Sequence, residues 1–488
     1  MRPVSEPMSE SENSCCGPAN SKPANGGYDL AVIGAGSAGF SAAITAADEG
    51  AQVALIGHGT IGGTCVNIGC VPSKTMIRAA ETLHQAKAAH RFGGLEAQGR
   101  IRDWSAVMAD KTELVDQLRQ AKYVDVLPNY NSIAYLEGAA RLTEDGVEVN
   151  GAAIKAGKTV IATGSSPSLA SIPGIDQVPY LTSTTALELD HLPKSLIVIG
   201  AGVIGCELGQ MFARMGSEVT IACRSRLLPD EEPEISEVLK LSLMSEGIGV
   251  LTGVDYKSIR ENGQICLEYE SSGSLHKLAA EHVLVATGRR PNADGLGLQE
   301  LGIERLTNGG IKVDDRMRTT RPGVYAVGDV TGRDMFVYMA AHGAKIAALN
   351  ALNGDNRRYD DSAIPEVVFT DPQAASVGLT EAEARSAGHD VVTSVLDLGN
   401  VPRALAARDI RGLIKLVAEK ETKRLLGAHI LAPEGADSIQ TATLAIKQGL
   451  TYEELGDMIF PYLTTVEGLK LAAQTFDKDV SKLSCCAG

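Results

Sequence analysis

Two cysteines five positions apart are the residues best suited to carry chemistry. Cys65 and Cys70 lie within residues 62–74, which read GGTCVNIGCVPSK. A disulfide needs Cβ atoms about 4 Å apart, and the flanking glycines permit the backbone distortion that this closure requires. A helix beginning here would lower the pKa of a thiol and favour the reactive thiolate. The string therefore predicts a redox-active pair rather than two buried free cysteines.

Adjacent thiols occur at two other places. Cys485 and Cys486 stand in the final stretch LSCCAG, and adjacent thiolates on a mobile tail suit the capture of a soft metal ion. Cys15 and Cys16 lie in residues 1–26, which lack apolar periodicity and are predicted to be a mobile arm. These two either collect metal or are incidental. The remaining cysteines are interpreted as packing residues: Cys206, Cys223 and Cys266.

Two glycine-rich turns predict two dinucleotide sites. An apolar strand over 28–33 runs into GAGSAG and a helix, and a strand over 196–199 runs into GAGVIG and a second helix. In such units the first glycine permits the turn, the second lets phosphate approach the backbone, and the third lets the helix pack on the strand. The helix N-terminus then offers free N–H groups to the pyrophosphate. The six glycines are Gly34, Gly36, Gly39, Gly200, Gly202 and Gly205.

Repeated strand ends indicate how the two units are connected. The second unit lies between the similar strings VIATG at 160–164 and VLVATG at 283–288, and VYAVGD follows at 324–329. This order predicts an α/β fold with two Rossmann-like dinucleotide-binding domains, the second inserted into the first. After about residue 360 the strands and helices continue without glycine fingerprints, which predicts a third domain of α+β type.

The end of the second strand in each unit selects the nucleotide. An acidic residue there would accept hydrogen bonds from a ribose 2′-OH. In the second unit Arg224 and Arg226 follow this point, and cations without a carboxylate favour a 2′-phosphate, hence NADPH over NADH. Solvated surface arginines are the alternative. In the first unit Gly57, followed by His58, replaces the acid, which weakens the expected ribose contact but not the pyrophosphate site.

Composition narrows the class of protein. A chain of 488 residues suggests about three domains, and a formal net charge of −15 disfavours nucleic acid and anionic membranes as partners. The most apolar long window, 196–215, holds Glu207 and a glycine fingerprint, so it reads as a strand and a helix rather than a membrane span. No secretory signal is visible, and nine cysteines do not form a secreted disulfide pattern. We therefore expect a cytoplasmic protein.

Residues 62–74 resemble the redox-active signature of the pyridine nucleotide-disulfide oxidoreductases, which include glutathione reductase and dihydrolipoamide dehydrogenase. The resemblance covers about residues 27–488. It implies an FAD domain, an inserted NADPH domain and a C-terminal dimerisation domain in a homodimer whose subunits share their active sites. The implied boundaries are 27–165 and 287–360 for the FAD domain, 166–286 for the NADPH domain and 361–488 for the dimerisation domain.

The resemblance also implies roles for individual residues. Cys70 would lie against the flavin and Cys65 would be the outer, exchanging thiol. Lys74 would pair with Glu207 near the flavin N5, and Asp329 would bind the ribityl chain. The residues expected to contact the cofactors are the six fingerprint glycines together with Gly63, Thr64, Lys74, Thr163, Gly164, Glu207, Arg224, Arg226, Gly288 and Asp329.

One position departs from most disulfide reductases of this family. Their C-terminal domain supplies a His and, five residues on, a Glu, and this His shuttles the proton of the thiol. Residues 460–467 read FPYLTTVE, so Glu467 is kept while Tyr462 stands at the His position. A phenol with a pKa of about 10 is a poor general base at neutral pH. The predicted chemistry therefore needs no thiol proton shuttle.

Tyr462 together with the tail thiols resembles the family members that reduce Hg(II) with NADPH. In those members two tyrosines line the metal path, and the matching positions are Tyr123 and Tyr462. Cys485 and Cys486 of the partner subunit would take Hg(II) from a thiol adduct and pass it to the inner cysteine pair, where it becomes Hg(0). Many such members carry an N-terminal GMTCxxC module, which this sequence lacks.

Two other classes of protein are alternatives. A large thioredoxin reductase-like enzyme can also end in adjacent cysteines, but it needs the His base that Tyr462 displaces. A non-catalytic mercury-binding protein would need the cysteines but not two nucleotide fingerprints. Bound yellow flavin would exclude the second class, and Hg(II)-dependent NADPH oxidation would separate the first.

Overall fold

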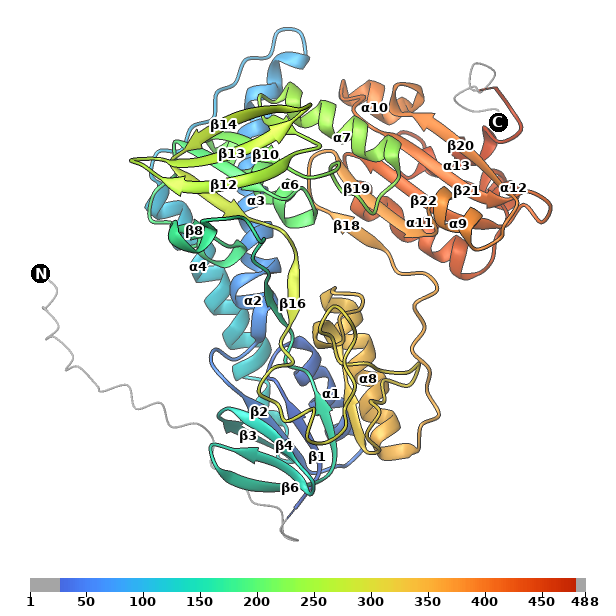
Figure 1. Cartoon of the computed structure of the whole chain (residues 1–488). Coiled ribbons are helices and arrows are strands. Elements are labelled where there is room, and N and C mark those ends of the chain that lie inside the picture. Colours follow the sequence, from blue (N-terminus) through green and yellow to red (C-terminus); the bar gives the residue numbers. More distant parts are fainter. Residues whose placement is uncertain (1–26, 480–488) are drawn as a thin grey trace, which may run out of the picture.

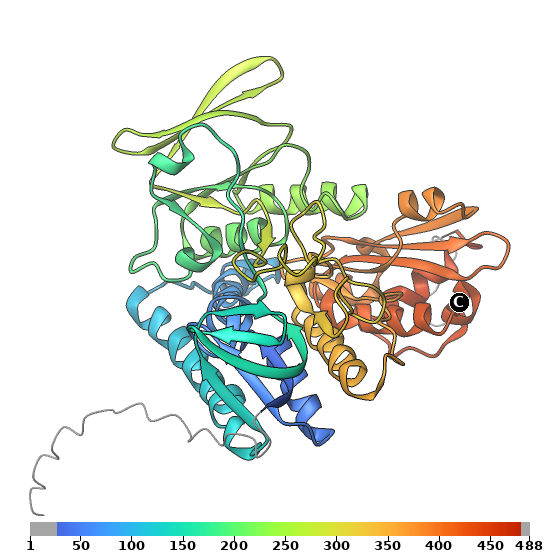
Figure 2. The same ribbon diagram turned by 60° about the horizontal axis from the view of Figure 1, so that its bottom comes forward.

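The computed structural model describes residues 27–479. The adjacent cysteines at 15–16 and at 485–486 lie outside the described residues. Within 27–479 the chain forms three bodies, each built around its own sheet (Figure 1; Figure 2). No helix in this range is long and apolar enough to cross a membrane.

The first body is a parallel sheet in the order β3-β2-β1-β6, with β17 also paired to β6. Alternate residues of β1 enter two different cores, because successive side chains of a strand point to opposite faces. Leu30 and Val32 pack with helices α1 and α8, whereas Ala31 and Ile33 pack with the β4–β5 hairpin. The elements are β1 (Tyr28–Ile33), α1 (Ser37–Asp48), β2 (Val53–Gly57), β3 (Ile133–Glu137), β4 (Ala140–Thr143), β5 (Gly146–Val149), β6 (Ala152–Ile161), β17 (Val324–Ala326) and α8 (Val337–Asn353).

The second body is a parallel sheet in the order β11-β10-β9-β15-β8, with the antiparallel sheet β12-β13-β14 beside it. The chain leaves the first sheet after β6 and returns to it at β17, and the short strands β7 and β16 pair where it crosses. The predicted insertion is therefore confirmed. The elements are β7 (Ser165–Pro167), β8 (Tyr180–Leu181), α5 (Ser183–Ala186), β9 (Ser195–Ile199), α6 (Val203–Met215), β10 (Glu218–Ala222), α7 (Pro233–Ser245), β11 (Gly249–Leu251), β12 (Asp255–Glu261), β13 (Ile265–Ser271), β14 (Ser274–Ala280), β15 (His282–Val285) and β16 (Arg289–Pro291).

The third body is an antiparallel sheet in the order β18-β19-β22-β21-β20, with helices packed on it at the right of Figure 1. Its presence confirms the predicted fold class of two dinucleotide-binding units and a C-terminal α+β unit. The elements are β18 (Glu366–Val368), β19 (Gln373–Gly378), α9 (Glu381–Ser386), β20 (Val391–Asp397), α10 (Pro402–Ala407), β21 (Leu413–Glu419), β22 (Leu425–Ala432), α11 (Gly435–Lys447), α12 (Tyr452–Asp457) and α13 (Glu467–Gln474).

Helix α3 (Cys70–Lys87) links the first body to the second. Its buried residues Met76 and Ala80 belong to the same core as Leu208 and Phe212 of α6. That core continues into the third body, since Leu431 of β22 is part of it. The residue that begins α3 is therefore held in place by packing from all three bodies.

A buried ammonium group joins the second and third bodies. Lys415 of β21 is only 2% exposed, and its Nζ donates to Glu232 at 3.0 Å, Glu234 at 2.9 Å and Glu381 at 3.1 Å. Glu232 is itself 2% exposed. A carboxylate this deeply buried needs a compensating charge, because desolvation strongly disfavours an isolated ion.

Replacing Lys415 with Met should lower the melting temperature of the FAD-loaded protein by roughly 3–5 °C, because an unpaired buried carboxylate costs about 3–5 kcal/mol. Differential scanning calorimetry measures this change. The matched control is Lys423→Met, whose partner Glu453 is 50% exposed and whose own side chain is 39% exposed. That surface pair contributes about 0–1 kcal/mol, so its loss should hardly move the transition. Equal shifts in the two variants would contradict the prediction.

Candidate active site

A single cavity of about 1110 Å³ collects the predicted site residues from separate segments. It lies where the first glycine turn, the start of α3, the start of α6 and the segment after β17 meet. This volume is at the upper end for ligand pockets and suits an elongated ligand. The predicted residues that line it are Gly34, Gly36, Gly63, Thr64, Cys65, Cys70, Lys74, Thr163, Gly164, Glu207 and Asp329.

The cysteine pair spans the junction of two helices. Cys65 lies in α2 (Gly63–Ile68), and Cys70 is the first residue of α3. Both are half-buried thiols in the structure. A hydrogen bond between the two thiols, together with the charge of Lys74, lowers the pKa of Cys70 to about 7 against the effect of burial. The same hydrogen bond, with burial, raises the pKa of Cys65. The arrangement therefore favours ionisation of Cys70 over ionisation of Cys65.

Lys74 lies one turn after Cys70 on α3 and carries the nearest positive charge. Its Nζ donates to Glu207 Oε2 at 2.7 Å, and the ion pair expected from the sequence is present. Glu207 is 3% exposed, and its Oε1 accepts a hydrogen bond from the backbone N–H of Phe369 at 2.8 Å. The ammonium group also lies 4.9 Å from the centroid of the Phe369 ring, within cation–π range. One carboxylate thus ties together α3, α6 and the third body.

Asp329 has a supporting network that the sequence did not reveal. Its Oδ2 accepts from Ser165 Oγ at 2.6 Å, and Ser165 Oγ in turn accepts from Arg289 Nε at 2.8 Å. Arg289 lines the cavity and is half-buried, so it is a site residue that sequence reasoning missed. The sequence could have indicated Arg289 by its position directly after Gly288, at the end of the strand in residues 283–288.

The first glycine turn tests whether a dinucleotide fits. A Cβ on Gly34, which has φ +115°, would lie 2.2 Å from Ala162 O, and a Cβ on Gly39 would lie 1.7 Å from Gly34 O. The protein's own packing therefore requires both glycines. At Gly36 the nearest atom would be Gly63 Cα at 3.5 Å, an ordinary contact, and φ is −93°. Neither packing nor backbone explains this glycine, whereas close approach of a pyrophosphate does.

The second glycine turn repeats this pattern. Gly200 and Gly205 are required by packing, because their Cβ atoms would lie 2.4 Å from Ala286 O and 2.1 Å from Gly200 O. A Cβ on Gly202 would meet no heavy atom of the described residues within 4 Å. Gly202 also caps α6 without a side-chain hydrogen bond, as Gly36 caps α1. Both helices therefore present free N–H groups where a phosphate would lie, so the residues fit two dinucleotides.

The two arginines at the end of β10 have different surroundings. Arg224 is exposed and makes no hydrogen bond or ion pair with any residue of 27–479. Arg226 is half-buried, and its Nη2 donates to the carbonyls of Pro229 at 2.7 Å and Glu231 at 2.6 Å. Arg224 is thus the cation available to a ligand, while Arg226 also holds the following turn.

Gly57 stands where the first unit was expected to have an acid. A Cβ there would lie 2.4 Å from the hydroxyl oxygen of Tyr135 and 2.9 Å from Ala35 Cβ. An acidic side chain therefore has no room at this position. His58, the next residue, lines the cavity instead. The missing acid is thus a consequence of packing by Tyr135 of β3.

The two tyrosines of the expected metal path lie in different bodies. Tyr123 is half-buried, its hydroxyl lies 3.0 Å from Ser37 Oγ, and burial followed by the nearby Cys65 and Cys70 raises its pKa. Tyr462 lies in the third body and is 51% exposed. The predicted residues that do not line the cavity are Gly39, Tyr123, Gly200, Gly202, Gly205, Arg224, Arg226, Gly288, Tyr462 and Glu467.

Comparisons with known proteins agree with this architecture. Residues 28–345 match the pyridine nucleotide-disulphide oxidoreductase family, and residues 364–473 match the dimerisation domain of that family. The chain is 48% identical over 464 residues to a mercuric reductase of Lysinibacillus sphaericus, which covers 94% of this chain and 85% of that protein. It is 47% identical over 473 residues to a mercuric reductase of Streptomyces lividans, which covers 95% of this chain and 99% of that protein.

A solved structure supports the same assignment. The Cu(II) complex of the HOCl-induced flavoprotein disulfide reductase RclA from Escherichia coli aligns with a TM-score of 0.81 and 31% sequence identity, over 92% of this chain and 99% of that chain. The two family matches follow the order of the sheets along the chain and together span most of it. The chain therefore belongs to the pyridine nucleotide-disulphide oxidoreductase family, whose cofactors are FAD and a pyridine nucleotide.

Proposed function

We propose that this enzyme reduces Hg(II) to Hg(0) with electrons from NADPH. The observation that carries the proposal is the cavity in which the Cys65–Cys70 pair lies beside a dinucleotide turn. The similarity to two mercuric reductases over almost the whole chain supports Hg(II) as the substrate. Thiolates are soft ligands and bind soft ions tightly.

The net reaction balances without a further reactant. NADPH and Hg(II) become NADP⁺, a proton and Hg(0), so the two electrons of one hydride reduce one ion. FAD, when bound along the first glycine turn and Asp329, supplies the two-electron chemistry that connects a hydride donor to a thiol centre. The chain's own contribution is to hold the ion and to control the protons of the thiols.

The hydrogen bond between the cysteines prepares the pair for a metal ion. Cys70 is the more easily ionised of the two, because its hydrogen bond with Cys65 and the charge of Lys74 lower its pKa. Hg(II) would be held by both sulfurs, and it would displace the proton of the outer thiol Cys65, since metal binding drives deprotonation of its ligands. Lys74 remains beside the pair because Glu207 holds it at 2.7 Å.

No histidine base is needed for this reaction. Tyr462 occupies the position where disulfide reductases of the family supply a His, and a phenol stays protonated at neutral pH. The released proton comes from a thiol that the metal has acidified, so a proton shuttle would add little. Tyr123, which packs edge-on against Phe40 at 4.9 Å between ring centroids, would orient the ion instead.

A homodimer would complete the site. The C-terminal body matches the dimerisation domain of the family, and its loop around Tyr462 carries an apolar surface. Ile459 is 99% exposed and Leu463 is 42% exposed, as expected for side chains that a second subunit covers. We propose that Tyr462, the supporting Glu467 and the tail thiols act on the cavity of the partner subunit, with domain boundaries near residues 165, 286 and 360.

Purified enzyme should oxidise NADPH when Hg(II) is added and should respond much less to glutathione disulfide or thioredoxin. Cys65→Ser should reduce the Hg(II)-dependent rate to background while leaving FAD bound, because the inner pair is then incomplete. Steady-state NADPH absorbance and the flavin spectrum measure both effects. Cys266→Ser, which changes a thiol of β13 outside the cavity, is the matched control. A higher rate with thioredoxin than with Hg(II) would instead support a thioredoxin reductase, and full Hg(II) turnover by Cys65→Ser would remove the inner pair from the reaction.

Arg224→Ala should raise the KM for NADPH about 10- to 100-fold, the effect of losing a charged hydrogen bond to a 2′-phosphate, and should leave the KM for NADH nearly unchanged. Initial rates with each nucleotide at saturating Hg(II) give the comparison. Arg260→Ala is the control, because Arg260 is 53% exposed on the neighbouring sheet and pairs with Glu268. Equal losses for NADPH and NADH in Arg224→Ala would point to a structural defect rather than phosphate recognition.

Changing Cys485 and Cys486 together to Ala should lower kcat/KM for glutathione-bound Hg(II) on the order of 100-fold, because tethered thiols raise the local concentration of the metal carrier. Turnover of a small mercuric halide should change less, since it can diffuse to the half-buried inner pair. FAD content and flavin reduction by NADPH should stay normal. Cys266→Ser, which changes a thiol outside the cavity, is the control and should keep the rate on the glutathione adduct. A tail variant with unchanged rates on that adduct would exclude the delivery role.

A further inference from the structure

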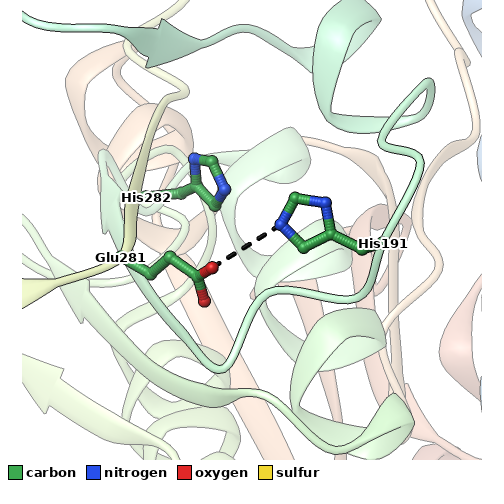
Figure 3. Close-up of side chains that lie close together, drawn as sticks. All are labelled: His191, Glu281 and His282. Atoms are coloured by element: carbon green, nitrogen blue, oxygen red, sulfur yellow. Dashed lines mark ion pairs between the residues drawn. The ribbon is translucent and has the colours of Figure 1, made fainter.

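A second group of metal-ligating side chains lies in the second body, on loops that the proposed reaction does not use. His191 lies between α5 and β9, while Glu281 and His282 lie at the junction of β14 and β15. Figure 3 shows the His191 ring and the Glu281 carboxylate facing each other, with the His282 ring beside them. Two segments separated by about ninety residues of chain thus bring two imidazoles and one carboxylate together.

The spacing of these groups is close to that of a coordination sphere. One ligand atom from each residue lies within 4.8 Å of the other two. His191 Nε2 and Glu281 Oε1 are 3.5 Å apart. Tetrahedral bonds of about 2.1 Å place neighbouring ligand atoms about 3.4 Å apart. The His191–Glu281 edge already has that length, and a ligand atom of His282 lies within 4.8 Å of both.

Neighbouring groups orient two of the three ligands. Asp190 Oδ1 accepts a hydrogen bond from His191 Nδ1 at 2.5 Å, which leaves Nε2 directed at Glu281. A carboxylate on the far nitrogen of a ligating histidine is a common feature of zinc sites. Glu281 Oε2 accepts from the backbone N–H of Lys194 at 2.6 Å, which leaves Oε1 for an ion. His191 and Glu281 therefore each use one atom for support and offer the other.

We propose that His191, Glu281 and His282 form a binding site for a divalent transition-metal ion of the Zn²⁺ and Cu²⁺ type. Imidazole and carboxylate suit these borderline ions, whereas Mg²⁺ prefers oxygen ligands and Hg(II) prefers thiolates. Three protein ligands leave a fourth position for water. The His191 side chain is 56% exposed and that of Glu281 is 35% exposed, so an ion can enter from solvent.

The site lies at the other end of β9 and β15 from the second glycine turn, and none of its three residues lines the cavity, which gives it a different role. His282 pairs in register with Leu196, at the amino-terminal ends of β15 and β9, whereas the glycine turn follows the carboxyl end of β9. Four residue steps of about 3.3 Å each, from Leu196 to Gly200, separate the two ends by roughly 13 Å. An ion here would join the segment before β9 to the β14–β15 junction. It would act as a clamp on the second sheet and take no part in electron transfer.

The test measures the number of Zn²⁺ ions bound per chain of the intact holoenzyme after its thiols have been blocked. The protein is oxidised so that the inner pair is a disulfide, its other cysteines are alkylated, and metal is removed with a chelator. Equilibrium dialysis against Zn²⁺ should then show one more ion per chain in the wild type than in His191→Ala with His282→Ala. Glu281→Gln, which keeps the shape and the acceptor for Lys194, should weaken this site roughly 10- to 100-fold. Bound Cu²⁺ should give an electron paramagnetic resonance spectrum with coupling to two imidazole nitrogens.

The matched control is His389→Ala. His389 also pairs with a carboxylate, Glu419 at 2.5 Å, and is 36% exposed, but among residues 27–479 no second imidazole joins that pair. This variant should bind as much zinc as the wild type. All variants should keep FAD and Hg(II)-dependent NADPH oxidation, which shows that they fold and separates this test from that of the proposed reaction. Equal zinc content in the wild type and the double variant, or a copper spectrum without imidazole coupling, would overturn the proposal.

Discussion

The ion pair between Lys74 and Glu207 is the interaction on which the site depends. Glu207 is almost fully buried, so its charge is tolerated only because Lys74 and the Phe369 backbone N–H compensate it. Lys74 follows Cys70 by four residues, hence by about one helical turn on the same side of α3. Because Lys74 is paired with Glu207, the same ion pair also fixes the position of Cys70 at the start of α3. The buried carboxylate of Glu207 contacts groups from the first and third bodies and itself belongs to the second, so it fixes the position of the Cys70 sulfur relative to all three.

The two cysteines have opposite pKa shifts, and no histidine is needed to produce this difference. The hydrogen bond between the two thiols favours the thiolate of Cys70 and disfavours ionisation of Cys65 itself. For an enzyme that exchanges disulfides, the protonated partner would need a base to release its proton. For an enzyme that binds a soft cation, the cation displaces that proton. The presence of Tyr462 in place of a base is therefore consistent with metal reduction in physical terms.

Ligand chemistry separates the two proposed metal sites of the chain. Sulfur ligands at the inner pair suit a soft ion in transit, whereas the nitrogen and oxygen ligands around His191 suit a borderline ion that stays bound. The His191 group lies at the amino ends of the parallel strands β9 and β15, and the second glycine turn follows the carboxyl end of β9. Such strands naturally present a dinucleotide turn at their carboxyl ends, and their amino ends are free to carry a structural clamp.

Local sequence was sufficient for the features that depend on neighbouring residues. The sequence predicted both glycine turns with their flanking strands and helices, the inner cysteine pair, and the insertion of one unit into the other. These features could be predicted because hydrophobic periodicity, turn residues and repeated strand ends are encoded in short segments. The Lys74–Glu207 pair came from resemblance to a family, since 133 positions separate the two residues.

Only the tertiary structure could decide contacts between distant segments. Arg289 joins the site through Ser165, Arg226 is partly engaged by the carbonyls of its own turn, and Tyr135 from the next strand occupies the space where Gly57 would otherwise carry an acid. His191 meets Glu281 and His282 only because β9 and β15 are adjacent in the sheet. Sequence specifies which groups are available, but strand order and packing determine which of them meet, because side-chain interactions extend only a few ångströms.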